Sequence, residues 1–203
     1  MSHISGVQSA QSPLALRASG SRALLIAAVL LAVSLVLPWW HMTMYAPQYP
    51  AGLSASAGVF SIHGDVTEIN ELNHYIGFMP LEHVAPIERR AGIVLGPLIV
   101  LLALAAAFLG GPWRLLATPA VVLPVFTVAD LAGWLWYAGN HLDPHAALST
   151  SVAPWTPHML GPGGVGQFHT FAMFDPGFAL AVAAAVLVVS ALRRRHRPAV
   201  GQR

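Results

Sequence analysis

Three side chains that bind soft metal ions fall within four consecutive positions near the start of the chain. They are His41, Met42 and Met44, directly after the Pro-Trp-Trp sequence at 38–40. Imidazole suits copper, zinc and iron, and a thioether selects cuprous copper. The same residues also fit a membrane interface, where tryptophans anchor the chain and methionines fill irregular packing. Two interpretations therefore remain open, a metal site and an ordinary aromatic belt.

A larger pool of histidines and methionines follows in the polar parts of the chain. The chain contains no Cys, so this chain cannot supply thiolate copper ligands, a Cys-based zinc finger or c-type haem attachment. A metal would have to bind His, Met, carboxylate or backbone oxygen, and we predict copper. The predicted ligand pool is His41, Met42, Met44, His74, Met79, His83, His158 and Met159.

One acidic residue, Asp130, lies inside an apolar segment. At about eight residues from the expected outer end of that segment, it would lie roughly 12 Å deep. A charge at that depth is costly, so the side chain should face the bundle interior with a partner. Ser34, Thr127 and a histidine from one of the loops are the candidate partners. Asp130 could contact a proton, ion or ligand, or could be a structural carboxyl group.

The composition indicates a membrane protein. The chain is 56% hydrophobic and only 9% charged, whereas soluble domains carry roughly 25% charged residues. Four apolar segments are long enough to approach the roughly 20 residues that a spanning helix needs. We predict spans at about 22–40, 91–109, 115–138 and 174–192. A disordered tail at 1–20 and a basic tail at 193–203 would flank them.

The arginines predict the orientation of these spans. The chain has no Lys, and eight of its ten arginines fall in the two tails, at Arg22 where the first span begins, or in the turn between the second and third spans. Only Arg89 and Arg90 lie on the other side. Because basic residues favour the cytoplasm, we predict a multi-pass protein of the bacterial cytoplasmic membrane with both termini inside. Most histidines and acids then lie outside.

Two external loops, 41–88 and 139–173, would carry this polar chemistry. In the first, the alternation before His63 fits a short strand. Asp65 and Glu68 resemble a capping box, and apolar spacing predicts a helix over 66–76 that ends at Gly77. The second loop is rich in Pro and Gly, which predicts little regular structure. The expected fold is an all-α integral membrane protein: four antiparallel transmembrane helices with a small extracytoplasmic cap.

Two segments of the first loop carry a family resemblance. The sequences MYAPQYPAGL at 44–53 and EINELNHYIG at 68–77 resemble those of small bacterial membrane proteins encoded near genes for copper enzyme maturation, such as that of nitrous oxide reductase. The likeness extends to Pro-Trp-Thr-Pro at 154–157. It implies a role in copper handling and assigns no individual site residue.

Three functions are compatible with these features. The leading hypothesis is a non-enzymatic accessory protein whose cap binds copper or docks a periplasmic metalloenzyme. The first alternative is a structural or assembly subunit of a respiratory membrane complex with no metal of its own. The second alternative is a small transporter or membrane enzyme that uses Asp130. The lipid bilayer is the expected environment in every case, and the basic cluster beside a span argues against nucleic-acid binding.

Overall fold

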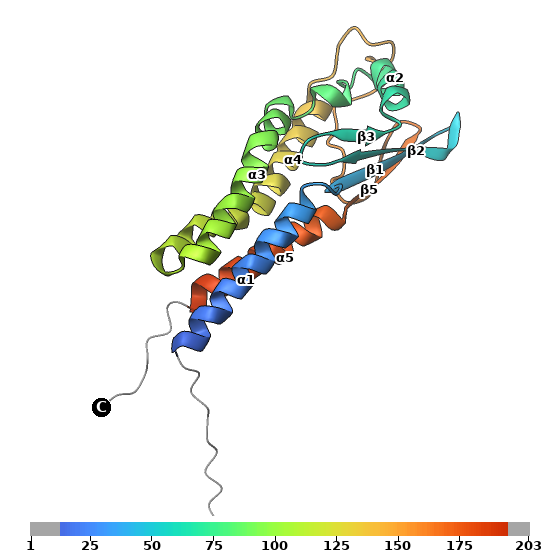
Figure 1. Ribbon diagram of the computed structural model, residues 1–203. Helices are drawn as coiled ribbons and strands as arrows, with labels where there is room; N and C mark the ends of the chain where they lie inside the picture. The colour runs from blue at the N-terminus through green and yellow to red at the C-terminus, as the bar shows by residue number, and fades with distance from the viewer. Residues whose placement is uncertain (1–12, 195–203) are drawn as a thin grey trace, which may run out of the picture.

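The computed structural model describes residues 13–194, which form a bundle of long helices with a cap at one end (Figure 1). Three helical segments are long and apolar enough to cross a membrane: Pro86–Leu109, Gly111–Asn140 and Pro176–Arg193. A shorter apolar stretch, Gly20–Ser34, belongs to the first helix. The helical elements of the bundle are α1 (Pro13–Ser34), α3 (Pro86–Leu109), the 3-10 helix η2 (Gly111–Ala117), α4 (Pro119–Asn140) and α5 (Pro176–Arg193).

The ends of the first and last helices differ from the predicted spans. Helix α1 begins at Pro13, so 13–20 is helical instead of disordered, and it ends at Ser34 instead of Trp40. Helix α5 begins at Pro176 because the preceding residues form a strand. The predicted segments 91–109 and 115–138 lie within α3 and within η2 and α4. Residues 1–12 and 195–203 of the predicted tails lie outside the described residues.

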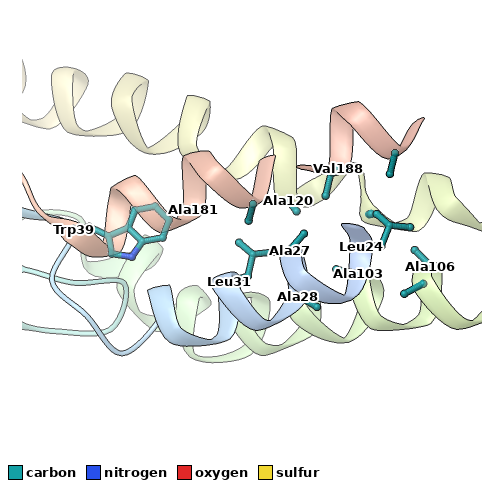
Figure 2. Close-up of a cluster of buried hydrophobic side chains, with 14 residues drawn as sticks. Leu24, Ala27, Ala28, Leu31, Trp39, Ala103, Ala106, Ala120, Ala181 and Val188 are labelled. Carbon is teal, nitrogen blue, oxygen red and sulfur yellow. The ribbon is translucent and has the colours of Figure 1, made fainter. Parts of the chain in front are cut away.

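Small side chains allow the bundle helices to pack closely. Helix α1 lies against α5 and α3, and alanines fill most of the interface (Figure 2). In lipid, close backbone approach of this kind drives helix association, because lipid is as apolar as the side chains themselves. The fully or almost fully buried residues include Leu24, Ala27, Ala28, Leu31, Ala103, Ala106, Ala181, Ala184 and Val188.

A set of hydrogen bonds joins the bundle to the cap. The hydroxyl of Ser34 at the end of α1 donates to the carbonyl of Gly177 at the start of α5 (2.7 Å). The indole Nε1 of Trp39 donates to the Ser34 carbonyl (2.9 Å), and the Gly177 amide donates to the Pro38 carbonyl (3.0 Å). The last turn of α1 and the first turn of α5 are therefore held together directly below the cap.

The cap contains a five-stranded antiparallel sheet. The strand order is β3-β2-β1-β5-β4, so β1 lies in the centre. The strands are β1 (Trp40–Ala46), β2 (Tyr49–Ala57), β3 (Ile62–Gly64), β4 (Gly161–Val165) and β5 (Phe168–Phe174). The prediction of an all-α protein is therefore wrong. So is the prediction that the second loop has little regular structure, because its last third supplies two strands.

Helix α2 (Val66–Ile76) covers one face of the sheet. Its bounds confirm the predicted helix over 66–76, and Gly77 ends it with a left-handed φ of 79°. The capping box at its start is not formed, because the Asp65 carboxylate accepts from the Ser54 amide (2.8 Å) and makes no cap bond. A short 3-10 helix, η1 (Leu81–His83), follows. The apolar residues buried between α2 and the sheet are Met44, Leu53, Ala55, Ile69, Leu72, Ile76 and Phe168.

Candidate functional site

Strand β1 separates the first three predicted metal ligands. Successive side chains of a strand point to opposite faces of the sheet. Met44 is buried in the core with α2, and Met42 packs against the same core. His41 therefore lies on the opposite face, together with Thr43 and the exposed Tyr45. The three residues are close in sequence, but the sheet separates His41 on one face from Met42 and Met44 on the other.

The other predicted ligands lie apart from one another. His74 is exposed on α2, where its ring meets Tyr75, and His83 is exposed in η1. The half-buried Met79 lies between these two elements. Within 13–194, no group of three or more His, Asp or Glu residues is placed to hold a metal ion. The four histidines of the predicted pool therefore form no such group, and Met42 and Met44 lie on the sheet face opposite to His41.

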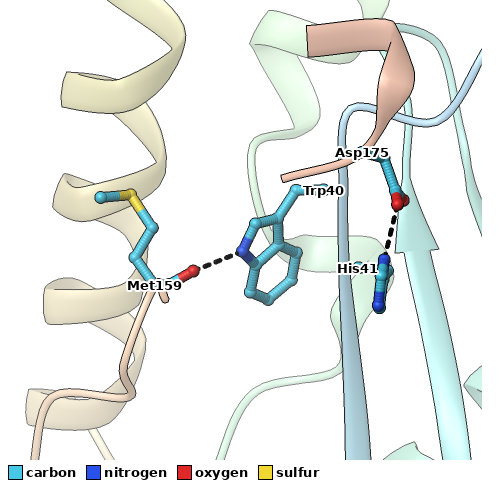
Figure 3. A network of polar contacts seen from close by, with 4 residues as sticks. All are labelled: Trp40, His41, Met159 and Asp175. Atoms are coloured by element: carbon cyan, nitrogen blue, oxygen red, sulfur yellow. Dashed lines mark hydrogen bonds and ion pairs between the residues drawn. The ribbon is translucent and has the colours of Figure 1, made fainter. Parts of the chain in front are cut away.

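Loop residues His158 and Met159 lie just before β4. His158 is exposed, and its Nδ1 is hydrogen-bonded to the Pro162 carbonyl (2.6 Å). Met159 is half-buried, and its backbone carbonyl accepts from the indole Nε1 of Trp40 (2.8 Å) (Figure 3). This bond ties the second loop to the start of β1. Met159 thus has a positioning role through its backbone.

A different pair of soft donors does come together on the exposed face of the sheet. In the antiparallel register, His41 lies directly opposite Met173 of β5. Directly opposed residues have Cβ atoms about 4.5–5.5 Å apart. Ligand atoms around one metal ion lie about 3–4 Å apart at ordinary bond lengths. The imidazole of His41 and the thioether of Met173 can therefore reach a single ion.

A carboxylate orients the His41 ring. Asp175 Oδ1 lies 2.7 Å from His41 Nδ1, and the side chains are 13% and 28% exposed (Figure 3). An Nδ1–H that donates to a carboxylate leaves the Nε2 lone pair free, the arrangement commonly found behind metal-ligating histidines. Met173 is 43% exposed. Two accessible soft donors therefore stand side by side, one of them held in orientation by an acid.

Sequence reasoning did not single out Met173 and Asp175 as site residues. The alternation in Phe-His-Thr-Phe-Ala-Met-Phe at 168–174 is the signal that could have indicated a strand. No family model, curated protein or solved structure matches the chain.

Asp130 has a different neighbour from those expected. The Thr127 hydroxyl donates to the Leu123 carbonyl (3.0 Å), and the Ser34 hydroxyl is engaged with Gly177. Asp130 lies close enough to Glu88 for their charges to interact. Because Glu88 is in the first turn of α3, Asp130 lies level with the charged start of that helix. The depth of Asp130 in a membrane, roughly 12 Å from the sequence, stays a prediction.

Proposed function

We propose that this chain is an accessory protein of the bacterial cytoplasmic membrane whose cap presents His41 and Met173 to cuprous copper. In this proposal α1, α3, α4 and α5 all span the membrane, and the cap lies on the extracytoplasmic side. The His41–Met173 pair replaces the larger ligand pool expected from sequence. The protein would hold copper for delivery to, or exchange with, a periplasmic metalloenzyme that docks on the exposed sheet face.

The distribution of arginines supports this topology. Arg22 of α1, Arg114 of η2 and Arg193 at the end of α5 belong to the end of the bundle that is distant from the cap (Figure 1). Arg89 and Arg90 lie at the cap end, in the first turns of α3. Since basic residues are enriched on the cytoplasmic side of short connections, the cap is expected to face outward.

The observation that carries the copper proposal is the hydrogen bond between His41 and Asp175 beside Met173. A thioether discriminates for the cuprous ion, and imidazole is an equally suitable partner. Two donors do not complete the usual coordination of an ion, so positions stay open for ligands from a second protein. An open pair on the exposed face of the sheet suits transfer better than permanent storage.

Copper binding should depend on both members of the pair. Titration of the full-length protein in detergent with Cu(I), in competition with a chromophoric chelator, measures the affinity. We expect His41→Ala and Met173→Leu each to weaken binding at least about tenfold, a loss equivalent to roughly 1.4 kcal/mol. Asp175→Asn should have a smaller effect, because it changes only the partner that orients the ring.

Two matched substitutions control this experiment. His83→Ala removes an exposed histidine from η1, and Met42→Leu removes a methionine from the opposite face of the same strand. Both should bind Cu(I) like the unchanged protein. Equal affinity in His41→Ala, Met173→Leu and the two controls would contradict the proposed pair.

A second candidate function, a subunit of a respiratory complex, is favoured by one feature of the bundle. An open groove of about 820 Å³ runs between α4 and α5. Within a membrane such a surface fits a helix of another subunit. Purification in mild detergent, followed by native mass measurement and metal analysis, separates the two candidates. A stable larger complex in which this chain carries no copper would favour the subunit. The groove is lined mainly by small and aliphatic residues, including Val121, Val125, Val128, Ala132, Val182, Ala185 and Val189.

A further inference from the structure

We propose that a cavity between the sheet and the outer part of α4 binds a lipid-soluble six-membered ring that carries a carbonyl oxygen, the chemistry of a quinone headgroup. The site lies on the covered face of the sheet, away from His41 and Met173. It is independent of copper binding. The proposal concerns binding and includes no electron transfer step.

The cavity has walls from every part of the cap. Strands β1, β2 and β5 form its floor, α2 and the segment after it form one side, and α4 with the second loop forms the other. Its volume is about 120 Å³. An apolar protein cavity of about 150 Å³ takes up benzene, so the space suits one ring of that size. The wall of α4 consists of Leu131, Trp134, Leu135 and Ala138.

The lining favours a flat, apolar ligand. Five aromatic side chains contribute to it, and among the described residues that line it none is charged and none is a histidine. Aromatic rings stack on planar groups through offset and edge-to-face contacts. The ring centroids of Phe78 and Trp155 are 5.6 Å apart, and the two ring planes are tilted by 41° to each other. A planar ligand can contact both rings. The five aromatic residues are Trp40, Phe78, Trp134, Trp155 and Phe168.

A single buried amide gives the cavity a polar contact. Asn73 of α2 is 6% exposed and lines the cavity. Its side-chain amide makes no hydrogen bond within the described part of the chain, and its atoms are not among the fully buried unpaired polar atoms there, so they keep some accessible surface. A ligand carbonyl that accepts from the Asn73 amide would satisfy it, which is the usual way that one polar group orients a ligand in an apolar pocket.

The membrane is the natural source of such a ligand. The residues of α4 that line the cavity begin at Leu131, one residue beyond Asp130, and Asp130 lies level with the charged start of α3. The exposed Trp136 and Tyr137 lie on the same stretch of α4, where aromatic side chains are typical of the membrane interface. A quinone whose hydrocarbon tail lies in the membrane would therefore place its ring at the membrane interface, level with these aromatic residues and the cavity.

Quenching of tryptophan fluorescence can test the site, because Trp40, Trp134 and Trp155 all line it. The full-length protein in detergent is titrated with a benzoquinone that bears a decyl tail. A parallel titration with decanol tests whether a hydrocarbon chain alone binds. Decanol is then added in competition with the quinone. We expect saturable quenching by the quinone and little competition by decanol at equal concentration.

Two variants locate the binding. Asn73→Leu keeps the side-chain volume and removes the amide, so we expect quinone affinity to fall at least about tenfold, as for one lost hydrogen bond. Ala138→Phe places a ring in the cavity and should abolish saturable quenching. Ala179→Phe, at an exposed position of α5, is the control and should bind like the unchanged protein. Circular dichroism confirms that each variant is folded.

Three outcomes would overturn the proposal. The first is quenching without saturation in the unchanged protein. The second is equal quinone affinity in the unchanged protein and in a folded Asn73→Leu. The third is competition by decanol as strong as that of the quinone itself, which would make the cavity a site for hydrocarbon chains in general.

Discussion

Gly177→Val should strongly destabilise the protein and separate the cap from the bundle. A Cβ atom at position 177 would lie 2.5 Å from the Pro38 carbonyl oxygen and 2.9 Å from that of Leu37. Both atoms belong to the backbone, so no side chain can rotate to make room. The Gly177 amide would lose its bond to Pro38, and the Ser34 hydroxyl would lose its acceptor. Overpacking typically costs about 1–3 kcal/mol, and we expect the upper end of that range.

Thermal unfolding in detergent, followed by circular dichroism, measures this effect, and size-exclusion chromatography reports loss of the folded form. Ala179→Val is the matched control, because it adds the same β-branched side chain at an exposed position two residues along α5. The control should unfold close to the temperature of the unchanged protein. If Gly177→Val and Ala179→Val unfold together, the proposed junction does not hold the two parts.

Gly139→Ala should detach the second loop from α4. A Cβ at this position would lie 1.9 Å from the carbonyl oxygen of Trp155, whose amide donates to the Gly139 carbonyl (3.0 Å). The loop must move away, because the colliding atoms are backbone. Trp155 forms part of the cavity wall, so this variant should also lose saturable quenching by the decyl benzoquinone. We expect a loss of about 2–3 kcal/mol in stability, near the top of the overpacking range.

Gly133→Ala provides the comparison within the same helix. A Cβ at position 133 meets nothing within 4 Å, and alanine in place of glycine at a compatible helical position stabilises by about 0.4–1 kcal/mol. Thermal unfolding of the two variants should therefore shift in opposite directions. A Gly139→Ala protein as stable as Gly133→Ala would show that the Trp155 segment is not packed against α4.

The sequence patterns that predicted structure correctly are local. The apolar spacing of Ile69, Leu72 and Ile76 and the glycine at 77 sufficed for α2, because a helix encodes its buried face within a few turns. The long apolar segments indicated helices of membrane length in the same way. A long apolar segment can be recognised from its composition alone, without knowing which other helices it packs against.

Apart from the short strand near His63, which β3 matches in part, the sequence does not predict the sheet because its pattern depends on distant partners. In β1 both faces carry large or apolar side chains, such as Met44 inside and Tyr45 outside, so the alternation that marks a half-buried strand is weak. The site depended on the same information. His41 and Met173 meet only through the register of two strands that are 132 positions apart, and neither residue signals that pairing.

The central position of β1 also imposes an order on synthesis. β1 must pair with β5, yet about 120 residues separate the end of β1 at Ala46 from the start of β5 at Phe168. At about 5–20 residues per second, ribosomes need roughly 6–24 s to make that stretch. Until then β1 presents an unpaired edge, which is a template for aggregation. The sheet can therefore close only after β5 has been made, and until then β1 keeps this edge exposed.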